Sequence, residues 1–183
     1  MKRIIFFSIM AVLLSGCMST PDIKVYAPEQ DETIAIVYID MSQAKTPAHY
    51  GWLQSDKPIN SRTHFQVFSK EDKKLGTILY AQKLKPGRYS LESIGGSTYL
   101  SRMEYSLGSE KTPFLQFNVN KQGVIYLGSY KYIQYKTKLN KSGDFEIKKT
   151  KGPSEKEVLA AFLKQTDDKQ VAKLIQKRLG RLK

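Results

Sequence analysis

Cysteine and histidine, which supply many metal ligands and catalytic groups, are scarce in this chain of 183 residues. Cys17 is its one cysteine, which excludes an internal disulfide. Its two histidines, His49 and His64, lie fifteen residues apart, which is not the spacing of a zinc site. Neither a Gly-x-Ser-x-Gly elbow nor a phosphate-binding glycine loop is present. We therefore expect no metal, no cofactor and no enzymatic activity.

Long hydrophobic runs are confined to Ile4–Leu14, which follows Lys2 and Arg3. These eleven residues would extend roughly 16 Å as a helix, about half of a ~30 Å hydrocarbon core, so the run is too short to span a membrane. A positive start, a short apolar run and small residues before Cys17 are typical of a secretory signal. We expect residues 1–16 to be removed on export.

The end of this signal, Leu14-Ser15-Gly16-Cys17, resembles the lipobox of bacterial lipoproteins. The resemblance implies cleavage before Cys17, a lipid on its thiol and an acylated amino group. Two or three acyl chains hold a protein on a bilayer, because each buried methylene contributes about 0.8 kcal/mol. Met18, rather than an aspartate, comes next, which in a Gram-negative source implies the periplasmic leaflet of the outer membrane. The alternative is an ordinary signal that leaves Cys17 unmodified or in a disulfide.

The chain is expected to have four segments. They are a signal peptide at 1–16, a lipidated tether at 17–31, a β-sandwich domain at 32–150 and a basic helical segment at 151–183. Loss of residues 1–16 lowers the formal net charge from +13 to +11. From Lys148 onward, eleven Lys or Arg face four Asp or Glu, a net +7, so the positive charge gathers near the C-terminus. Nucleic acid is not an expected partner, because the signal directs the protein out of the cytoplasm.

Short apolar runs in the middle of the chain, rich in β-branched and aromatic residues, favour strands. They predict a mainly β fold, an antiparallel β-sandwich of about seven or eight strands with two short C-terminal α-helices. The expected strands are Thr33–Ile39, Thr63–Ser69, Thr77–Leu84, Arg88–Ile94, Tyr99–Ser106, Pro113–Val119, Val124–Leu139 and Phe145–Lys149. Turns are expected at Lys85–Gly87, Asn120–Gly123 and Asn140–Gly143.

Alternation within a strand assigns its side chains to the two faces of the sheet. Leu115, Phe117 and Val119 are expected in the core, and Phe114 is expected outside it. A bulge at Gly128 would let both halves of the longest strand bury apolar groups.

The run Leu84–Leu91, followed by Phe117–Val119 and Gly123–Gly128, resembles small bacterial lipoproteins with a prealbumin-like or carboxypeptidase-regulatory-like sandwich. The likeness covers roughly residues 74–149. It implies the sandwich but no particular activity, because such folds carry many functions.

Ser154 and Glu157 form a capping box that predicts a first helix over 155–165, and Thr166 or Asp167 is the predicted cap of a second. Each helix has an apolar stripe. In one interpretation both helices pack on the sandwich and their lysines face solvent. In the other, the second helix is a basic amphipathic element that binds anionic lipid or an acidic envelope protein. The cations assigned to the second role are Lys169, Lys173, Lys177, Arg178 and Arg181.

Residues 41–62 have weak strand character and contain the chain's one tryptophan, Trp52. We predict a loop there, in which His49 and Trp52 contact a ligand or Trp52 closes one end of the core.

Two functions compete. The first is a non-enzymatic envelope lipoprotein that acts as an adaptor or assembly factor. The second is a periplasmic domain that binds a glycan, a peptide or an anionic lipid, or is weakly catalytic. A cleft lined by Trp52, His49 and converging carboxylates would favour the second. The carboxylates considered for convergence are Asp40, Asp56, Glu92 and Glu104.

Overall fold

The computed structural model describes residues 24–59, 62–97, 102–108, 113–135 and 145–182. Cys17 and the predicted lipobox, the first part of the predicted tether and the predicted turn at Asn140–Gly143 lie outside the described residues.

The described residues form nine strands and two helices, so the mainly β fold with two C-terminal helices is confirmed. The elements are β1 (Thr33–Asp40), β2 (Tyr50–Ile59), β3 (Arg62–Asp72), β4 (Gly76–Leu84), β5 (Gly87–Ser97), β6 (Arg102–Ser106), β7 (Phe114–Val119), β8 (Gly123–Gln134), β9 (Phe145–Lys149), α2 (Glu155–Lys164) and α3 (Lys169–Leu179).

The strands belong to one curled sheet with the order β6-β5-β2-β3-β4-β1-β8-β9, and β7 pairs with β5 beside β6. Strands from the two ends of this order pack against each other, since the Tyr105 ring of β6 lies 5.3 Å from the Tyr132 ring of β8. The single sheet therefore curls around its core. All its pairs are antiparallel as expected except β1 with β8, which is parallel.

The inner face of the curled sheet holds the first hydrophobic cluster. Its fully buried members include Leu53, Leu84, Tyr89, Leu91 and Ile94. The Tyr89 hydroxyl donates a hydrogen bond to the Lys85 carbonyl over 2.8 Å. Burial raises the pKa of Tyr89 to about 12, so the phenol stays protonated and neutral inside the core.

The outer face of β1, β4 and β8 holds the second cluster, which α2 and α3 cover. Phe162 of α2 is fully buried, and its ring meets the Tyr80 ring edge-on at 5.2 Å. Val171 and Ile175 anchor α3 in the same cluster. The C-terminal helices thus pack on the sheet, as the first of the two expected arrangements has it.

The helix caps agree with the sequence in one case and differ in the other. Ser154 and Glu157 form the predicted capping box of α2. The cap of α3 is Asp168, not Thr166 or Asp167, because the Asp168 carboxylate accepts from the amides of Gln170 and Val171. The Thr166 hydroxyl instead donates to the Phe162 carbonyl and closes the end of α2.

Two bulges decide which side chains enter the core. Gly128 has a φ of 114° and lies at a shift of the β1–β8 register, so the predicted bulge is confirmed. Both halves of the strand bury apolar groups, Tyr126 beneath the helices and Tyr130 in the inner cluster. Leu115 has a φ of 54° at a register shift between β7 and β5. That bulge turns Phe114 onto the inner cluster, 5.4 Å from the Tyr130 ring, so the prediction that Phe114 lies outside was wrong.

Residues 24–32, mostly assigned to the tether by sequence, lie along the sheet on the helix side. Val25 is buried in the helix-covered cluster. The Tyr26 amide donates to Gln82 Oε1 over 2.9 Å, and Gln122 Nε2 donates to the Pro28 carbonyl over 2.9 Å. The described part of the predicted tether is therefore held by the domain.

Phe162→Ala tests the packing of the helices on the sheet. We expect it to lower the free energy of unfolding in urea by about 3–5 kcal/mol, because it leaves a cavity between α2 and β4. The exposed control Lys173→Ala should change stability by about 0.5 kcal/mol or less. A loss for Phe162→Ala of less than about 1 kcal/mol would contradict the observed packing.

Candidate functional site

The outer face of the sheet is covered over only half of its width. The helices cover β1, β4 and β8, and α2 also reaches β3, where Phe68 packs against the helix-covered cluster. No described helix packs over β2, β5 and β6 or over the part of β3 that carries His64 and Gln66. Strand register places Gln66, Trp52, Ser93 and Ser106 in one row across these four strands. We call this surface, together with His64, Glu92 and Glu104 beside the row, the open face.

The first hollow of the open face is acidic. It has a volume of about 340 Å³ and is lined by Trp52, His64, Glu92, Ser93, Glu104 and Ser106. Ser93 Oγ donates to Glu104 Oε1 over 2.7 Å, and His64 Nε2 lies 3.3 Å from Glu92 Oε2. No Lys or Arg is among these lining residues, although the chain as a whole has a net charge of +13.

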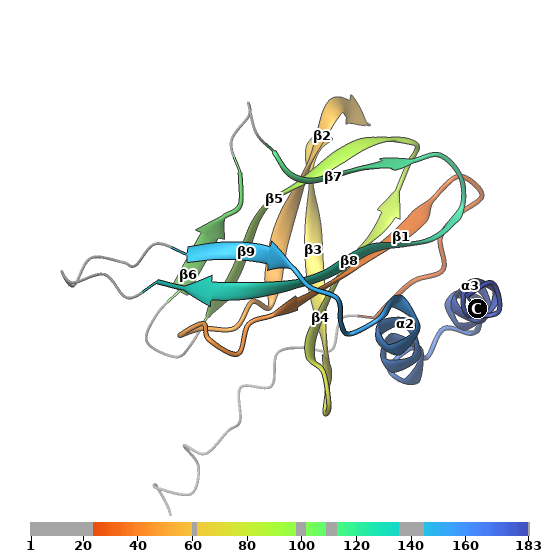
Figure 1. Ribbon diagram of the computed structural model, residues 1–183. Helices are drawn as coiled ribbons and strands as arrows, with labels where there is room; N and C mark the ends of the chain where they lie inside the picture. Colours follow the sequence, from red (N-terminus) through yellow and green to blue (C-terminus); the bar gives the residue numbers. More distant parts are fainter. Residues whose placement is uncertain (1–23, 60–61, 98–101, 109–112, 136–144, 183) are drawn as a thin grey trace, which may run out of the picture.

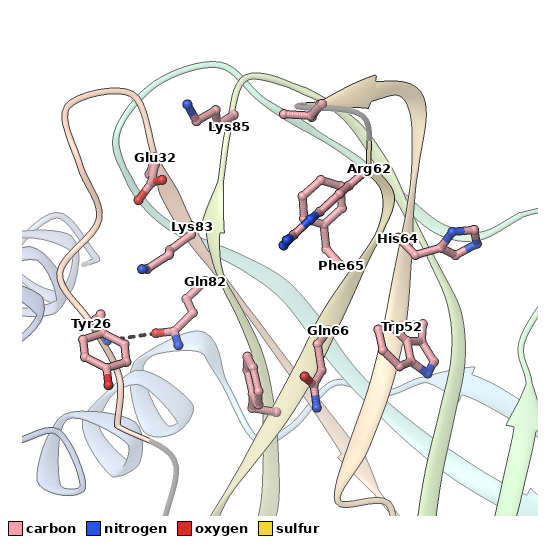
Figure 2. Close-up of a pocket in the computed structure, with 12 residues that line it drawn as sticks. Tyr26, Glu32, Trp52, Arg62, His64, Phe65, Gln66, Gln82, Lys83 and Lys85 are labelled. Atoms are coloured by element: carbon pink, nitrogen blue, oxygen red, sulfur yellow. Dashed lines mark hydrogen bonds between the residues drawn. The ribbon is translucent and has the colours of Figure 1, made fainter.

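The second hollow is basic and adjoins the first, because Trp52 and His64 line both. Its volume is about 700 Å³, and its cations are Arg62, Lys83 and Lys85. In Figure 2 Arg62 extends from β3 toward β4, and Lys83 extends from β4 toward Tyr26 and Glu32. Trp52 and His64 lie on the opposite side of Arg62 from Lys83. Buried Glu32 and exposed Tyr26, from the docked segment 24–32, form its rim.

Lys83 lies at a distortion of β4. Its φ of 60° coincides with a register shift in the β1–β4 pair. The distortion aims Gln82 at the backbone of Lys24 and Tyr26, and the Lys83 ammonium stands 5.3 Å from the centre of the Tyr26 ring. The strained residue thus helps to hold the docked segment and also contributes a cation to the basic hollow.

Trp52 lies in neither position that the sequence predicted. It belongs to strand β2 rather than to a loop, and it is a member of neither hydrophobic cluster, so it does not close the core. Its side chain is half-buried on the open face. His49, just before β2, lies 3.9 Å from Glu71 and lines neither described hollow. His64 stands beside Trp52 instead.

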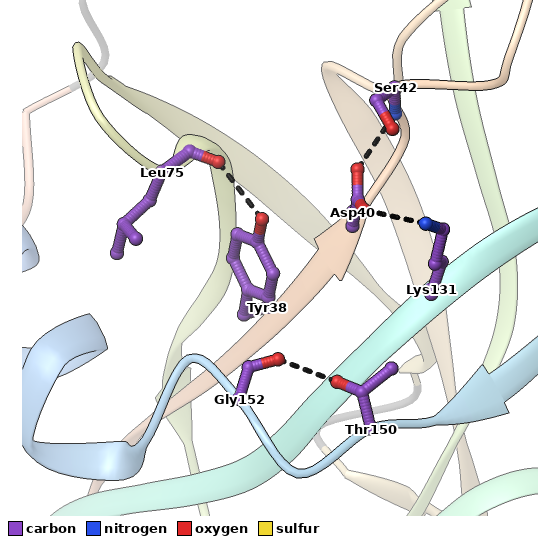
Figure 3. A network of polar contacts seen from close by, with 7 residues as sticks. All are labelled: Tyr38, Asp40, Ser42, Leu75, Lys131, Thr150 and Gly152. Atoms are coloured by element: carbon purple, nitrogen blue, oxygen red, sulfur yellow. Dashed lines mark hydrogen bonds and ion pairs between the residues drawn. The ribbon is translucent and has the colours of Figure 1, made fainter.

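Two of the four carboxylates considered by sequence converge, Glu92 and Glu104. Asp40 is paired with Lys131, at 3.7 Å, and accepts a hydrogen bond from the Ser42 amide (Figure 3). Burial raises the pKa of Asp40, but the hydrogen bonds from Ser42 and the charge of Lys131 outweigh it, so this pKa lies below its usual value. Asp56 is paired with Arg88. These two carboxylates therefore serve structural pairs.

The five cations predicted to bind an anionic surface have two different environments. Arg178 Nε donates to Glu155 Oε1 over 2.6 Å and its Nη2 to Oε2 over 3.2 Å, which joins α3 to α2. The other four are exposed on or just after α3: Lys169, Lys173, Lys177 and Arg181. Arg178 is thus a bridge between the helices, and the remaining cations face solvent.

Two further kinds of feature, metal-ligand clusters and membrane-spanning helices, are not found among the described residues. They contain no group of three or more His, Cys, Asp or Glu side chains placed to hold a metal ion. They also contain no helix with the length and hydropathy needed to cross a bilayer.

Comparison of the chain with protein-family models, with curated proteins and with solved structures finds no match.

Trp52 and its neighbour Leu53 provide a paired test of this assignment. Leu53 is 2 % exposed and belongs to the inner cluster, so Leu53→Ala should lower the free energy of unfolding by about 2–5 kcal/mol. Trp52→Ala should lower it by about 1 kcal/mol or less, because the indole lies on the open face. Urea denaturation of both variants measures the difference, and equal losses would place Trp52 in the core.

Proposed function

We propose that this protein is a lipid-anchored envelope protein, a bacterial lipoprotein held on the membrane through Cys17 and acting without catalysis as an adaptor or assembly factor. In a Gram-negative source it would lie on the periplasmic leaflet of the outer membrane. The lipobox-like Leu14–Cys17 supports the anchor. Support from the structure comes from one observation, the docking of residues 24–32 on the helix side of the sheet.

This docking limits how far the domain can move from the membrane. Seven residue steps separate Cys17 from Lys24, and they span at most about 25 Å even when fully extended. The chain then enters the helix-covered cluster through Val25, together with Val171 and Ile175 of α3. The anchor would therefore be attached to the domain on the side of the sheet that carries α3.

The exposed cations of α3 are suited to that position. A lysine or arginine near an anionic leaflet contributes about 1 kcal/mol, and this attraction falls off within a Debye length of about 8 Å. A short link that keeps α3 close to the surface would let Lys169, Lys173 and Lys177 contribute together. The lipid would supply the affinity, and the cations would set the orientation of the domain.

Truncating the chain before Ser154 would not test how the α3 cations orient the domain on the membrane, because it would also expose the hydrophobic cluster that the helices cover. Point substitutions of exposed α3 lysines leave this packing intact.

Cys17→Ser tests the anchor. In cells supplied with a labelled fatty acid, we expect the wild-type protein to carry the label and sediment with the membranes. The variant should carry no label and remain soluble after membranes are removed. Ser15→Thr, which keeps Cys17, is the control and should remain labelled. An unlabelled wild-type protein, or a Cys17→Ser variant that stays with the membranes, would contradict the proposed anchor.

A further inference from the structure

We propose that the open face is a glycan-binding site, which takes an amino-sugar chain bearing acidic groups and stacks one sugar ring on Trp52. This proposal goes beyond the membrane anchor and does not depend on it. It rests on three features of the open face: the position of Trp52, the acidic hollow and the adjoining basic hollow.

Trp52 is the first feature. A half-buried indole on an uncovered sheet face, outside both hydrophobic clusters, does little for the core. Sugar rings present a face of C–H groups that packs on aromatic rings, with hydroxyls around the edge. Gln66, a direct neighbour of Trp52 across the sheet, offers an amide at that edge. Ser93, the neighbour on the other side, is buried and donates its hydroxyl to Glu104, which holds that carboxylate beside the indole. The row thus combines the apolar platform and the polar edge that a sugar needs.

The acidic hollow is the second feature. Glu92 and Glu104 both line it, and a carboxylate accepts hydrogen bonds from hydroxyl and ammonium groups. Because no Lys or Arg is among its lining residues, this hollow favours a ligand that donates hydrogen bonds or carries positive charge. An amino sugar with a free amine does both, and acetylation of the amine would remove the charge.

The basic hollow is the third feature. Arg62, Lys83 and Lys85 would attract a carboxylate or phosphate substituent. Trp52 and His64 line both hollows, so a bound ring would have amine-binding groups on one side and acid-binding groups on the other. This charge arrangement excludes a purely anionic headgroup as the best ligand, because half of the site would repel it. A charged peptide has both signs but lacks the sugar ring face.

The chain's one tryptophan makes the test direct, because intrinsic tryptophan emission reports on Trp52 alone. The protein without residues 1–17 would be titrated with four probes. They are a glucosamine–muramic acid disaccharide, its N-acetylated form, glucosamine 6-phosphate and the peptide Lys-Ala-Glu. We expect a saturable change in emission with the disaccharide, and about tenfold weaker binding after acetylation because a charge-assisted contact is lost. The disaccharide carries a carboxylate and glucosamine 6-phosphate carries a phosphate, so their relative affinities show which of the two acidic groups the basic hollow prefers.

Two variants assign the contacts. Glu92→Gln with Glu104→Gln should remove the preference for the free amine, and Arg62→Gln with Lys83→Gln should weaken binding of both acid-bearing sugars. All four side chains lie outside the two hydrophobic clusters, although Lys83 also contacts the Tyr26 ring, and thermal unfolding checks that each variant is folded. The matched control, Glu71→Gln with Glu146→Gln, changes two exposed or half-exposed carboxylates outside both hollows and should bind as the wild type does.

Three results would overturn the proposal. The first is no saturable emission change with any sugar. The second is sugar binding that the Glu92 and Glu104 substitutions leave unchanged. The third is binding of the peptide as tight as that of the disaccharide, which would make the open face a peptide site.

Discussion

Burial of β1 on both faces is the constraint on which the rest of the structure depends. Every residue from Thr33 to Ile39 is buried. Ala35, Val37 and Ile39 belong to the inner cluster, while Ile34, Ile36 and Tyr38 belong to the cluster beneath the helices. A strand with apolar side chains on both faces requires cover on both, as in the sheets of α/β proteins. The curled sheet covers one face of β1, and α2 and α3 cover the other.

This constraint divides the outer face of the sheet. Two short helices are sufficient to cover β1, β4, β8 and the Phe68 part of β3, and they leave the rest of β3 together with β2, β5 and β6 uncovered. The covered half also receives residues 24–32, so the chain leads toward Cys17 from the helix side. In our account the covered half orients the domain on the membrane. The uncovered half, where a tryptophan and groups of both charge signs gather, is the part available to a ligand.

The sequence predicted those features whose causes are local. The Ser154–Glu157 capping box, the apolar run of β1 and the bulge at Gly128 follow from short-range patterns. Strand β2 was missed because its outward side chains lie on a polar open face and weaken the strand signal. The bulge at Leu115 moved Phe114 into the core, and no residue pattern marks it. The pairing of Glu92 with His64, two strands away, depends on sheet topology, which the sequence does not fix.

The central claim is that the helix side faces the membrane, and spin labelling of the lipidated protein in anionic vesicles tests it most directly. With Cys17 occupied by lipid, a cysteine placed at Lys173 or at Tyr135 is the one reactive thiol. Lys173 is an exposed residue of α3, and Tyr135, which is 44 % exposed, follows β8, whose end lies far from the helices in Figure 1. A relaxation agent confined to the bilayer surface should affect the label at 173 strongly and the label at 135 weakly. Equal effects at both positions, or a stronger effect at 135, would contradict the account.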